Sequence, residues 1–270
     1  MKINLSRIIV ISCFLLVAAR AWSLDPKDAP EGHELLQMVV TNIAPWGSLN
    51  KGVPEGLYVN LLQDIGREWG KAYQLKVMPY ARVVRDIEMG KADLSVLFDS
   101  PGASAAAHRI LPLPPVDVIV VMRDDLELKD LETRPEIKIG RLRLGFYGKK
   151  ALPVKDEQWL SINSIAQGVG MLERKRLHML VTTAPAYKYA LQQLNIDSVE
   201  GVRAEHVDSV RGSLFLSRLS ELPVEQVKAA AKRAMVRHWD ELQAISQLHN
   251  ASNVLHDAAL ESVAPTLAGR

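Results

Sequence analysis

The pattern of apolar and polar positions is most informative between Val77 and Phe98 (VMPYARVVRDIEMGKADLSVLF). It opens on the apolar-alternating run Leu75–Met78, which Pro79 closes. Tyr80–Met89 carries apolar residues at helical spacing, and the charged residues between them can face water. Gly90 follows, and glycine ends helices because it adopts the left-handed conformation without a Cβ penalty. Leu94–Phe98 is a continuous apolar run of the kind that a parallel sheet buries on both faces. The segment predicts a strand–helix–strand unit with a ligand crevice at the carboxyl ends of its strands.

Strands and helices are expected to alternate along the rest of the chain. Further strands are predicted over Leu36–Asn42, Val116–Met122, Arg141–Tyr147, His178–Thr182 and Ser213–Ser217. Further helices are predicted over Gly56–Trp69, Ser104–His108, Asn163–Glu173, Pro185–Leu194, Pro223–Val236 and Trp239–Leu248, and Ile43–Glu55 is rich in turn residues. This alternation predicts an α/β fold with mostly parallel sheets covered by helices. The strands at 116–122 and 213–217 are expected to carry the chain between two lobes and back.

The first residues have the pattern of an export signal. Lys2 and Arg7 precede the apolar run Ile8–Ala19, which is too short to span a bilayer. Ala19 and Ala21, or Ala21 and Ser23, provide the small residues at positions −3 and −1 that a signal peptidase needs. We expect residues 1–23 to be a cleavable signal peptide and the mature protein to be periplasmic; an N-terminal membrane anchor is the alternative.

Removal of this leader changes the charge of the protein. The chain has 33 Lys and Arg against 31 Asp and Glu, but Lys2, Arg7 and Arg20 belong to the leader, which leaves 30 against 31, a net charge of −1. A protein of that charge has no general attraction to nucleic acid or anionic lipid, so no nucleic-acid partner is expected. Cys13 is the only cysteine and also lies in the leader, so the mature chain is expected to have neither a thiol nor a disulfide.

The sequence contains no recognisable catalytic or metal-binding motif. The seven histidines form no HExxH or other metal spacing, and no GxSxG is present. Gly145–Lys150 (GFYGKK) lacks the first glycine and the Ser or Thr of a phosphate-binding loop. We therefore assign no catalytic residue and no metal ligand, and we expect no cofactor. Asp99 is the one obvious candidate for an acid or base if the chain were an enzyme.

A series of degenerate motifs runs through nearly the whole chain after the leader. It comprises Pro45-Trp46 after the first strand, Gly56–Leu62, Pro79–Arg82 continuing to Gly90–Asp93, Arg109 with the proline-punctuated stretch behind it, and Leu214–Ser217 before Pro223. In order and spacing, the series resembles the extracytoplasmic (periplasmic) solute-binding proteins of family 3, which include the polar amino-acid receptors. The resemblance implies the type II periplasmic binding protein fold: a two-lobed clamshell in which each lobe is a mostly parallel sheet flanked by helices. Residues 24–120 would begin lobe 1, 121–212 would form lobe 2, 213–250 would return to lobe 1, and 251–270 would be a tail.

The same resemblance implies a function. The protein is expected to be a monomeric receptor that captures a small polar or anionic solute between its lobes and presents it to an inner-membrane ABC transporter permease. Two alternatives use the same scaffold: an exported enzyme of the dehydratase-like kind, and a soluble sensory or accessory binding module. Fold similarity does not separate the three.

The resemblance also implies roles for individual residues. In that family an aromatic residue after the first strand packs on the ligand and an arginine after the third strand holds the ligand carboxylate; the matching positions are Trp46 and Arg109. The family's Thr three residues before that arginine is replaced by Ala106, and its ammonium-binding Asp by Thr182-Thr183. Without that Asp, an ammonium group in a closed cleft has no counter-charge. The departure favours a carboxylate, an aromatic acid or a neutral polar solute.

Further ligand contacts are expected where strands end and helices begin. They are Tyr80, Arg82, Asp99, Ser100, Thr182, Thr183 and Tyr187. Two of them have a plainer alternative: Arg82 as a solvated or structural arginine, and Thr183 as a helix N-cap. Trp46 is expected to face the ligand because a turn rarely buries a tryptophan fully.

Overall fold

The computed structural model describes residues 35–148, 152 and 154–246. The expected signal peptide at 1–23 and the expected tail at 251–270 lie outside these residues. Within the described ranges, no helix is long and apolar enough to cross a membrane.

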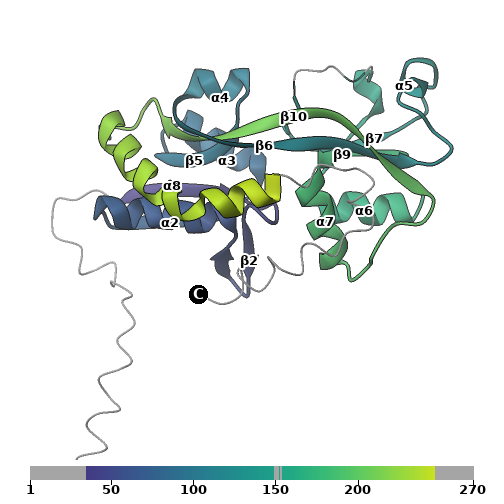
Figure 1. The fold of residues 1–270 in the computed structure, drawn as a ribbon. Helices are drawn as coiled ribbons and strands as arrows, with labels where there is room; N and C mark the ends of the chain where they lie inside the picture. The colour runs from purple at the N-terminus through teal and green to yellow at the C-terminus, as the bar shows by residue number, and fades with distance from the viewer. Residues whose placement is uncertain (1–34, 149–151, 153, 247–270) are drawn as a thin grey trace, which may run out of the picture. The chain divides into compact units, whose positions relative to one another are not determined.

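One eight-stranded sheet organises the fold, in the order β4-β1-β5-β10-β6-β9-β7-β8. Its long strands β6 and β10 run side by side (Figure 1). Its strands are β1 (Leu36–Thr41), β4 (Tyr73–Met78), β5 (Leu94–Phe98), β6 (Ala107–Arg123), β7 (Ile139–Leu142), β8 (Trp159–Ile162), β9 (Met179–Thr183) and β10 (Val202–Ser217). Strands β1, β4 and β5 form one parallel group, and β7, β8 and β9 form a second. The antiparallel pair β6–β10 joins the two groups, since β10 also pairs with β5 and β6 also pairs with β9.

Helices connect and cover these strands. They are α2 (Leu57–Trp69), α3 (Tyr80–Glu88), α4 (Pro101–Ala106), α5 (Asp130–Thr133), α6 (Ile165–Glu173), α7 (Ala184–Gln193) and α8 (Val224–Ser246), with the 3-10 turn η3 (Asp156–Gln158). A small hairpin of β2 (Ser48–Asn50) and β3 (Val53–Glu55) lies in the stretch that was expected to be rich in turns. The unit β4–α3–β5 confirms the strand–helix–strand prediction, and Gly90 follows α3 with a φ of 65°. The prediction of an α/β fold with mostly parallel pairing within each group is confirmed.

Several predicted boundaries are wrong. The strands expected over 116–122 and 213–217 are parts of the longer strands β6 and β10. The strand expected over Arg141–Tyr147 ends at Leu142, because Leu144 has a φ of 61° and the Gly145 N–H donates to the Leu142 carbonyl, which turns the chain. The two helices expected over 223–236 and 239–248 form the single helix α8, which continues through the residues between them. The helix expected over 104–108 begins earlier, at Pro101.

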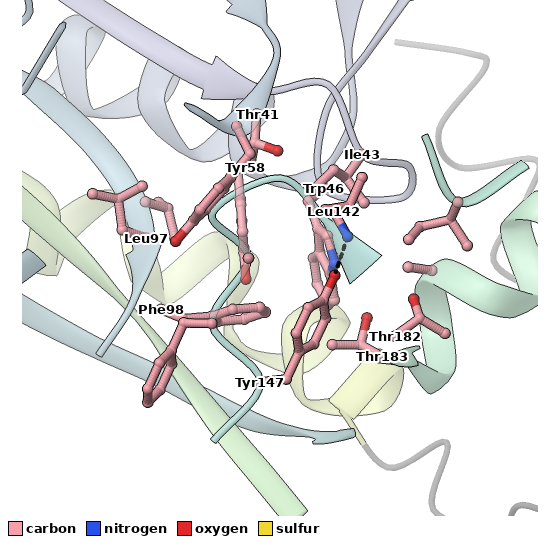
Figure 2. Close-up of a pocket in the computed structure, with 16 residues that line it drawn as sticks. Thr41, Ile43, Trp46, Tyr58, Leu97, Phe98, Leu142, Tyr147, Thr182 and Thr183 are labelled. Carbon is pink, nitrogen blue, oxygen red and sulfur yellow. Dashed lines mark hydrogen bonds between the residues drawn. The ribbon is translucent and has the colours of Figure 1, made fainter. Parts of the chain in front are cut away.

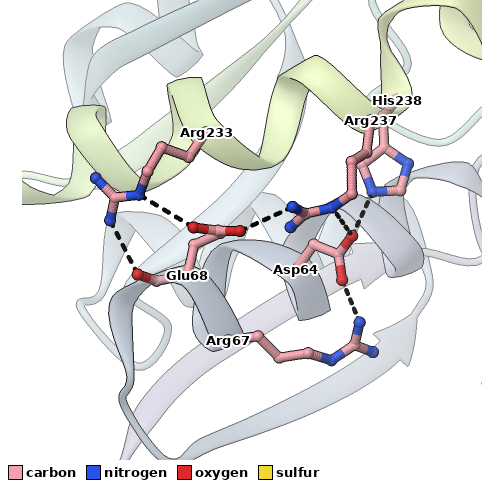
Figure 3. A network of polar contacts seen from close by, with 6 residues as sticks. All are labelled: Asp64, Arg67, Glu68, Arg233, Arg237 and His238. Carbon is pink, nitrogen blue, oxygen red and sulfur yellow. Dashed lines mark hydrogen bonds and ion pairs between the residues drawn. The ribbon is translucent and has the colours of Figure 1, made fainter.

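Helix α8 returns to α2 and is fixed there by a polar network (Figure 3). The Asp64 carboxylate accepts hydrogen bonds from Arg237 (3.1 Å) and His238 (3.0 Å) and pairs with Arg67. Glu68, one turn farther along α2, pairs with Arg237 at 2.8 Å and with Arg233. The end of the described chain is therefore attached to α2, the helix that follows the β2–β3 hairpin.

Candidate functional site

A cavity of about 40 Å³ lies where the carboxyl ends of β1, β5, β7 and β9 meet (Figure 2). It is lined by Thr41, Ile43, Trp46, Tyr58, Tyr80, Val96, Leu97, Phe98, Leu142, Gly145, Phe146, Tyr147, Ile165, Thr182, Thr183 and Ala186. Both parallel groups contribute to the lining, as do the first residues of α3, α6 and α7. This is the place at which the strand–helix–strand pattern predicts a ligand crevice.

The first group supplies a stacked aromatic pair. The rings of Trp46 and Tyr58 lie 4.9 Å apart between centroids and 19° from parallel. A tight turn after β1 sets Trp46, whose N–H donates to the Ile43 carbonyl, and the Tyr58 N–H donates in turn to the Trp46 carbonyl at 2.9 Å. Trp46 is 3% exposed, so the argument that its turn leaves it partly exposed is wrong. The turn folds onto the start of α2 and buries the indole there.

The second group supplies two aromatic residues from the segment after β7. Phe146 and Tyr147 pack against the large core cluster that contains Trp46 and Tyr58. The Tyr147 hydroxyl accepts a hydrogen bond from the Leu142 N–H at 3.3 Å, which fixes the ring across the turn at Gly145. Gly145, Phe146 and Tyr147, which belong to the segment that lacks the residues of a phosphate-binding loop, therefore form one wall of the cavity.

The described lining carries no formal charge. Among these residues there is no Asp, Glu, Lys, Arg or His, and the only titratable side chains are three tyrosines. Burial raises the pKa of Tyr80 to about 12, and burial likewise raises the pKa of Tyr58 and of Tyr147. All three phenols are protonated at neutral pH, so the lining presents only neutral groups to a ligand.

Two buried hydroxyls at this site lack a partner. Thr41 is 5% exposed and Thr182 is 1% exposed, and the Oγ1 atom of neither has a hydrogen-bond partner among the described residues. Thr41 ends β1 in the first group, and Thr182 lies in β9 of the second. Buried hydroxyls are nearly always hydrogen-bonded in folded proteins, because an unpaired one costs free energy. The pair therefore marks two candidate polar contact points in a lining whose other polar side chains are Thr183 and three tyrosines.

The structure brings four of the nine expected site residues to this cavity and leaves five outside it. Trp46, Tyr80, Thr182 and Thr183 line the cavity. Thr183 also occupies the N-cap position of α7, but its side chain makes no capping hydrogen bond, so the N-cap alternative is wrong. The residues outside the described lining are Arg82, Asp99, Ser100, Arg109 and Tyr187.

The structure gives most of those five residues another role. The Ser100 hydroxyl caps α4 by accepting the Ala103 N–H at 3.1 Å. Tyr187 lies on α7 and is fully buried in a core cluster, and Arg82 is exposed on α3.

Arg109 matches the family's carboxylate-binding arginine, but its side chain contacts two other residues of the protein. Its Nε lies 3.4 Å from Oδ2 of Asp99 and donates to the Ser213 hydroxyl at 3.1 Å. The same contact engages Oδ2 of Asp99, the candidate acid or base of an enzyme, while Oδ1 of Asp99 is buried without a hydrogen-bond partner among the described residues. Within the described ranges, no cluster of His, Cys, Asp and Glu fits a metal ion.

Most of the aromatic lining was missing from the sequence-based list. Tyr58 lies on α2 and looks like a core residue of an amphipathic helix. Phe146 and Tyr147 carried a usable signal, since adjacent aromatic residues just after a parallel strand lie near the carboxyl edge of the sheet.

No protein-family model and no curated protein matches this chain. Several solved structures match this chain. "EhuB in complex with hydroxyectoine" aligns with a TM-score of 0.64 and 15% identity, over 84% of this chain and 93% of that one. "An ancestral arginine-binding protein bound to glutamine" gives 0.62 and 17%, over 79% and 98%. A histidine kinase sensor domain "with similarity to periplasmic binding proteins" gives 0.61 and 14%, over 79% and 94%. The chain therefore has the two-lobed type II periplasmic binding protein fold.

Proposed function

We propose that this protein is a periplasmic receptor that binds a small solute in the cavity at the meeting edges of its two parallel groups. The observation that carries the proposal is that Thr41 and Thr182 line one cavity from opposite groups and that each has a buried hydroxyl without a partner among the described residues. Paired polar contacts inside an apolar, concave site are the usual construction of a small-molecule pocket. A ligand that contacts both groups would hold them together.

Closure by hinge motion fits the connections of the sheet. Strand β10 pairs with β5 over Gly212–Leu216, and β6 pairs with β9 over Val118–Met122, so the β6–β10 pair is shared by both groups. We propose that this pair is the hinge and that the lobes divide close to residues 120 and 212. The cavity of about 40 Å³ has room for only about three water molecules, so a solute enters when the groups separate.

Delivery to an inner-membrane ABC transporter permease is the role that we propose for the bound solute. Among proteins with this fold, one neighbour is described as the substrate binding protein of an amino acid ABC transporter, at 14% identity and a TM-score of 0.60. A sensory role is the second candidate, because the kinase sensor domain and a VFT2 domain of Bordetella pertussis BvgS have the same fold. The enzyme alternative has less support, since the carboxylate of Asp99 pairs with Arg109 and does not line the cavity.

Mass spectrometry of the solute that the purified protein retains, followed by calorimetric titration, tests the receptor proposal. We expect Trp46→Ala to weaken binding of that solute by at least about tenfold, because the substitution removes one ring of the stacked aromatic wall. Trp46→Phe keeps a ring and serves if the alanine variant does not fold. Trp239→Ala is the matched control, since Trp239 is 42% exposed on α8 and should leave the affinity unchanged. Equal affinities of the Trp46 variants and the wild type would place the solute elsewhere.

We expect Arg109→Ala to leave the affinity for the retained solute within about twofold, because Arg109 contacts Asp99 and Ser213 and not the cavity. The same titration measures this. A tenfold loss would show that Arg109 contacts the solute in the bound state, as the family resemblance implies.

A further inference from the structure

The cavity has a chemical character that selects among solutes. We infer that it takes an uncharged, flat, largely apolar solute, typically an aromatic or heteroaromatic ring, with hydrogen-bonding groups at its edge that contact the hydroxyls of Thr41 and Thr182. The inference rests on the proposed receptor function and names the class of its ligand.

The described lining of the cavity offers no counter-charge to a charged solute. A carboxylate or an ammonium group placed in this cavity would meet no opposite charge on the described lining. Burial of an unpaired charge is far more costly than burial of a neutral polar group. Arg109 does not line the cavity, and its Nε lies 3.4 Å from Oδ2 of Asp99, so it supplies no counter-charge on the described lining. The lining therefore discriminates against α-amino acids and against simple carboxylates.

Aromatic side chains make up much of the described lining. Six of the 16 described lining residues are aromatic, namely Trp46, Tyr58, Tyr80, Phe98, Phe146 and Tyr147. They come from both groups, so a solute between the groups is surrounded by ring faces and edges (Figure 2). Flat apolar solutes gain most from such a surface, because stacked or edge-to-face rings add attraction beyond the area that is buried.

The hydroxyls of Thr41 and Thr182 can bind neutral polar groups. Each hydroxyl can donate one hydrogen bond and accept others, so it pairs with an amide, a hydroxyl or a ring nitrogen without any charge. Ser95 supplies a comparison inside the same protein. Its hydroxyl is also buried and unpartnered among the described residues, but Ser95 lies in β5 and does not line the cavity. Thr41 and Thr182 are distinguished by their position at the cavity.

Three probes that share one ring test the charge requirement: benzamide, benzoate and benzylammonium. We expect benzamide to bind to the full-length protein at least about tenfold more tightly than either charged probe, by calorimetry at neutral pH. No binding of benzamide, or tighter binding of benzoate or benzylammonium, overturns the inference. If arginine or glutamine binds instead, with an affinity that falls in Trp46→Ala, the receptor proposal stands and the inference about ligand class fails. If no retained or added solute binds, the receptor proposal itself fails.

Valine substitutions test the hydroxyls, because valine has nearly the shape of threonine. Thr41→Val and Thr182→Val should each weaken benzamide binding about three- to tenfold, the loss expected for one hydrogen bond. Each should also raise the melting temperature of the ligand-free protein, by about 2 °C, since a buried unpaired hydroxyl is removed. Ser95→Ala is the control and should leave the benzamide affinity unchanged. Unchanged affinity in both valine variants overturns the assignment of these hydroxyls.

Discussion

Replacement of Gly47 by alanine should lower the stability of the protein by about 3 kcal/mol and abolish solute binding in the same variant. A Cβ atom at this position would overlap the Val40 side chain and lie 2.6 Å from the Thr41 carbonyl oxygen. Val40 and Thr41 cannot move aside, because β1 is held between β4 and β5 in the sheet. The turn that carries Trp46 would have to shift instead, and that turn sets the aromatic wall of the cavity.

Thermal unfolding followed by circular dichroism measures the first effect, and a decrease in melting temperature of roughly 6–12 °C is expected for a domain of this size. Gly102→Ala is the matched control. A Cβ atom there meets nothing closer than the Ser100 hydroxyl at 4.0 Å, and Gly102 lies within α4, where alanine is favoured over glycine. That variant should be at least as stable as the wild type. A Gly47→Ala variant that melts and binds like the control would show that the turn adjusts freely and would remove its role in positioning Trp46.

The parallel strands and their helices could be predicted from the sequence because their signals are local. In β4–α3–β5, for example, a buried apolar run and a glycine that ends a helix lie within a few residues of each other. The long strand β6 was only half predicted, since Pro112, Pro114 and Pro115 interrupt its first part. Those prolines are tolerated because that part of β6 pairs with β10 alone, while pairing with β9 begins at Val118. The number of neighbours of a strand is a property of the sheet and cannot be derived from local pattern.

The residues of the candidate site also differ in how far local sequence could predict them. Trp46, Tyr80 and Thr182 follow or end strands, so topology alone places them near the carboxyl edge of the sheet. The partners of a side chain are not encoded locally, and this is why Arg109 was expected at a ligand while the structure places it beside Asp99. The described lining is neutral because the fold places the charged residues outside it, and local sequence does not predict that placement.

Asp64→Asn should destabilise the protein by about 3 kcal/mol at pH 7, because the variant leaves His238 and two arginines around a buried neutral amide. Burial alone would raise the pKa of Asp64, but hydrogen bonds from His238 and Arg237 and the charge of Arg67 outweigh it, so the pKa is lowered. A carboxyl whose pKa is lower in the folded state than in the unfolded state stabilises the fold above its unfolded value, near pH 4. That contribution is lost as the pH falls through the folded pKa. The difference in stability between wild type and Asp64→Asn should therefore shrink from pH 7 to about pH 3.

Urea unfolding at several pH values measures this difference, and Glu68→Gln is the control within the same network (Figure 3). Hydrogen bonds from Arg237 and Arg233 also lower the pKa of Glu68, but its side chain is 24% exposed against 12% for Asp64. Water compensates a more exposed carboxylate better, so the loss in Glu68→Gln should be the smaller of the two. A stability difference for Asp64→Asn that stays constant with pH would show that the Asp64 charge does not attach α8 to α2. The attachment would then depend on apolar contacts, such as those of the fully buried Val227 and Ala231 in the core cluster.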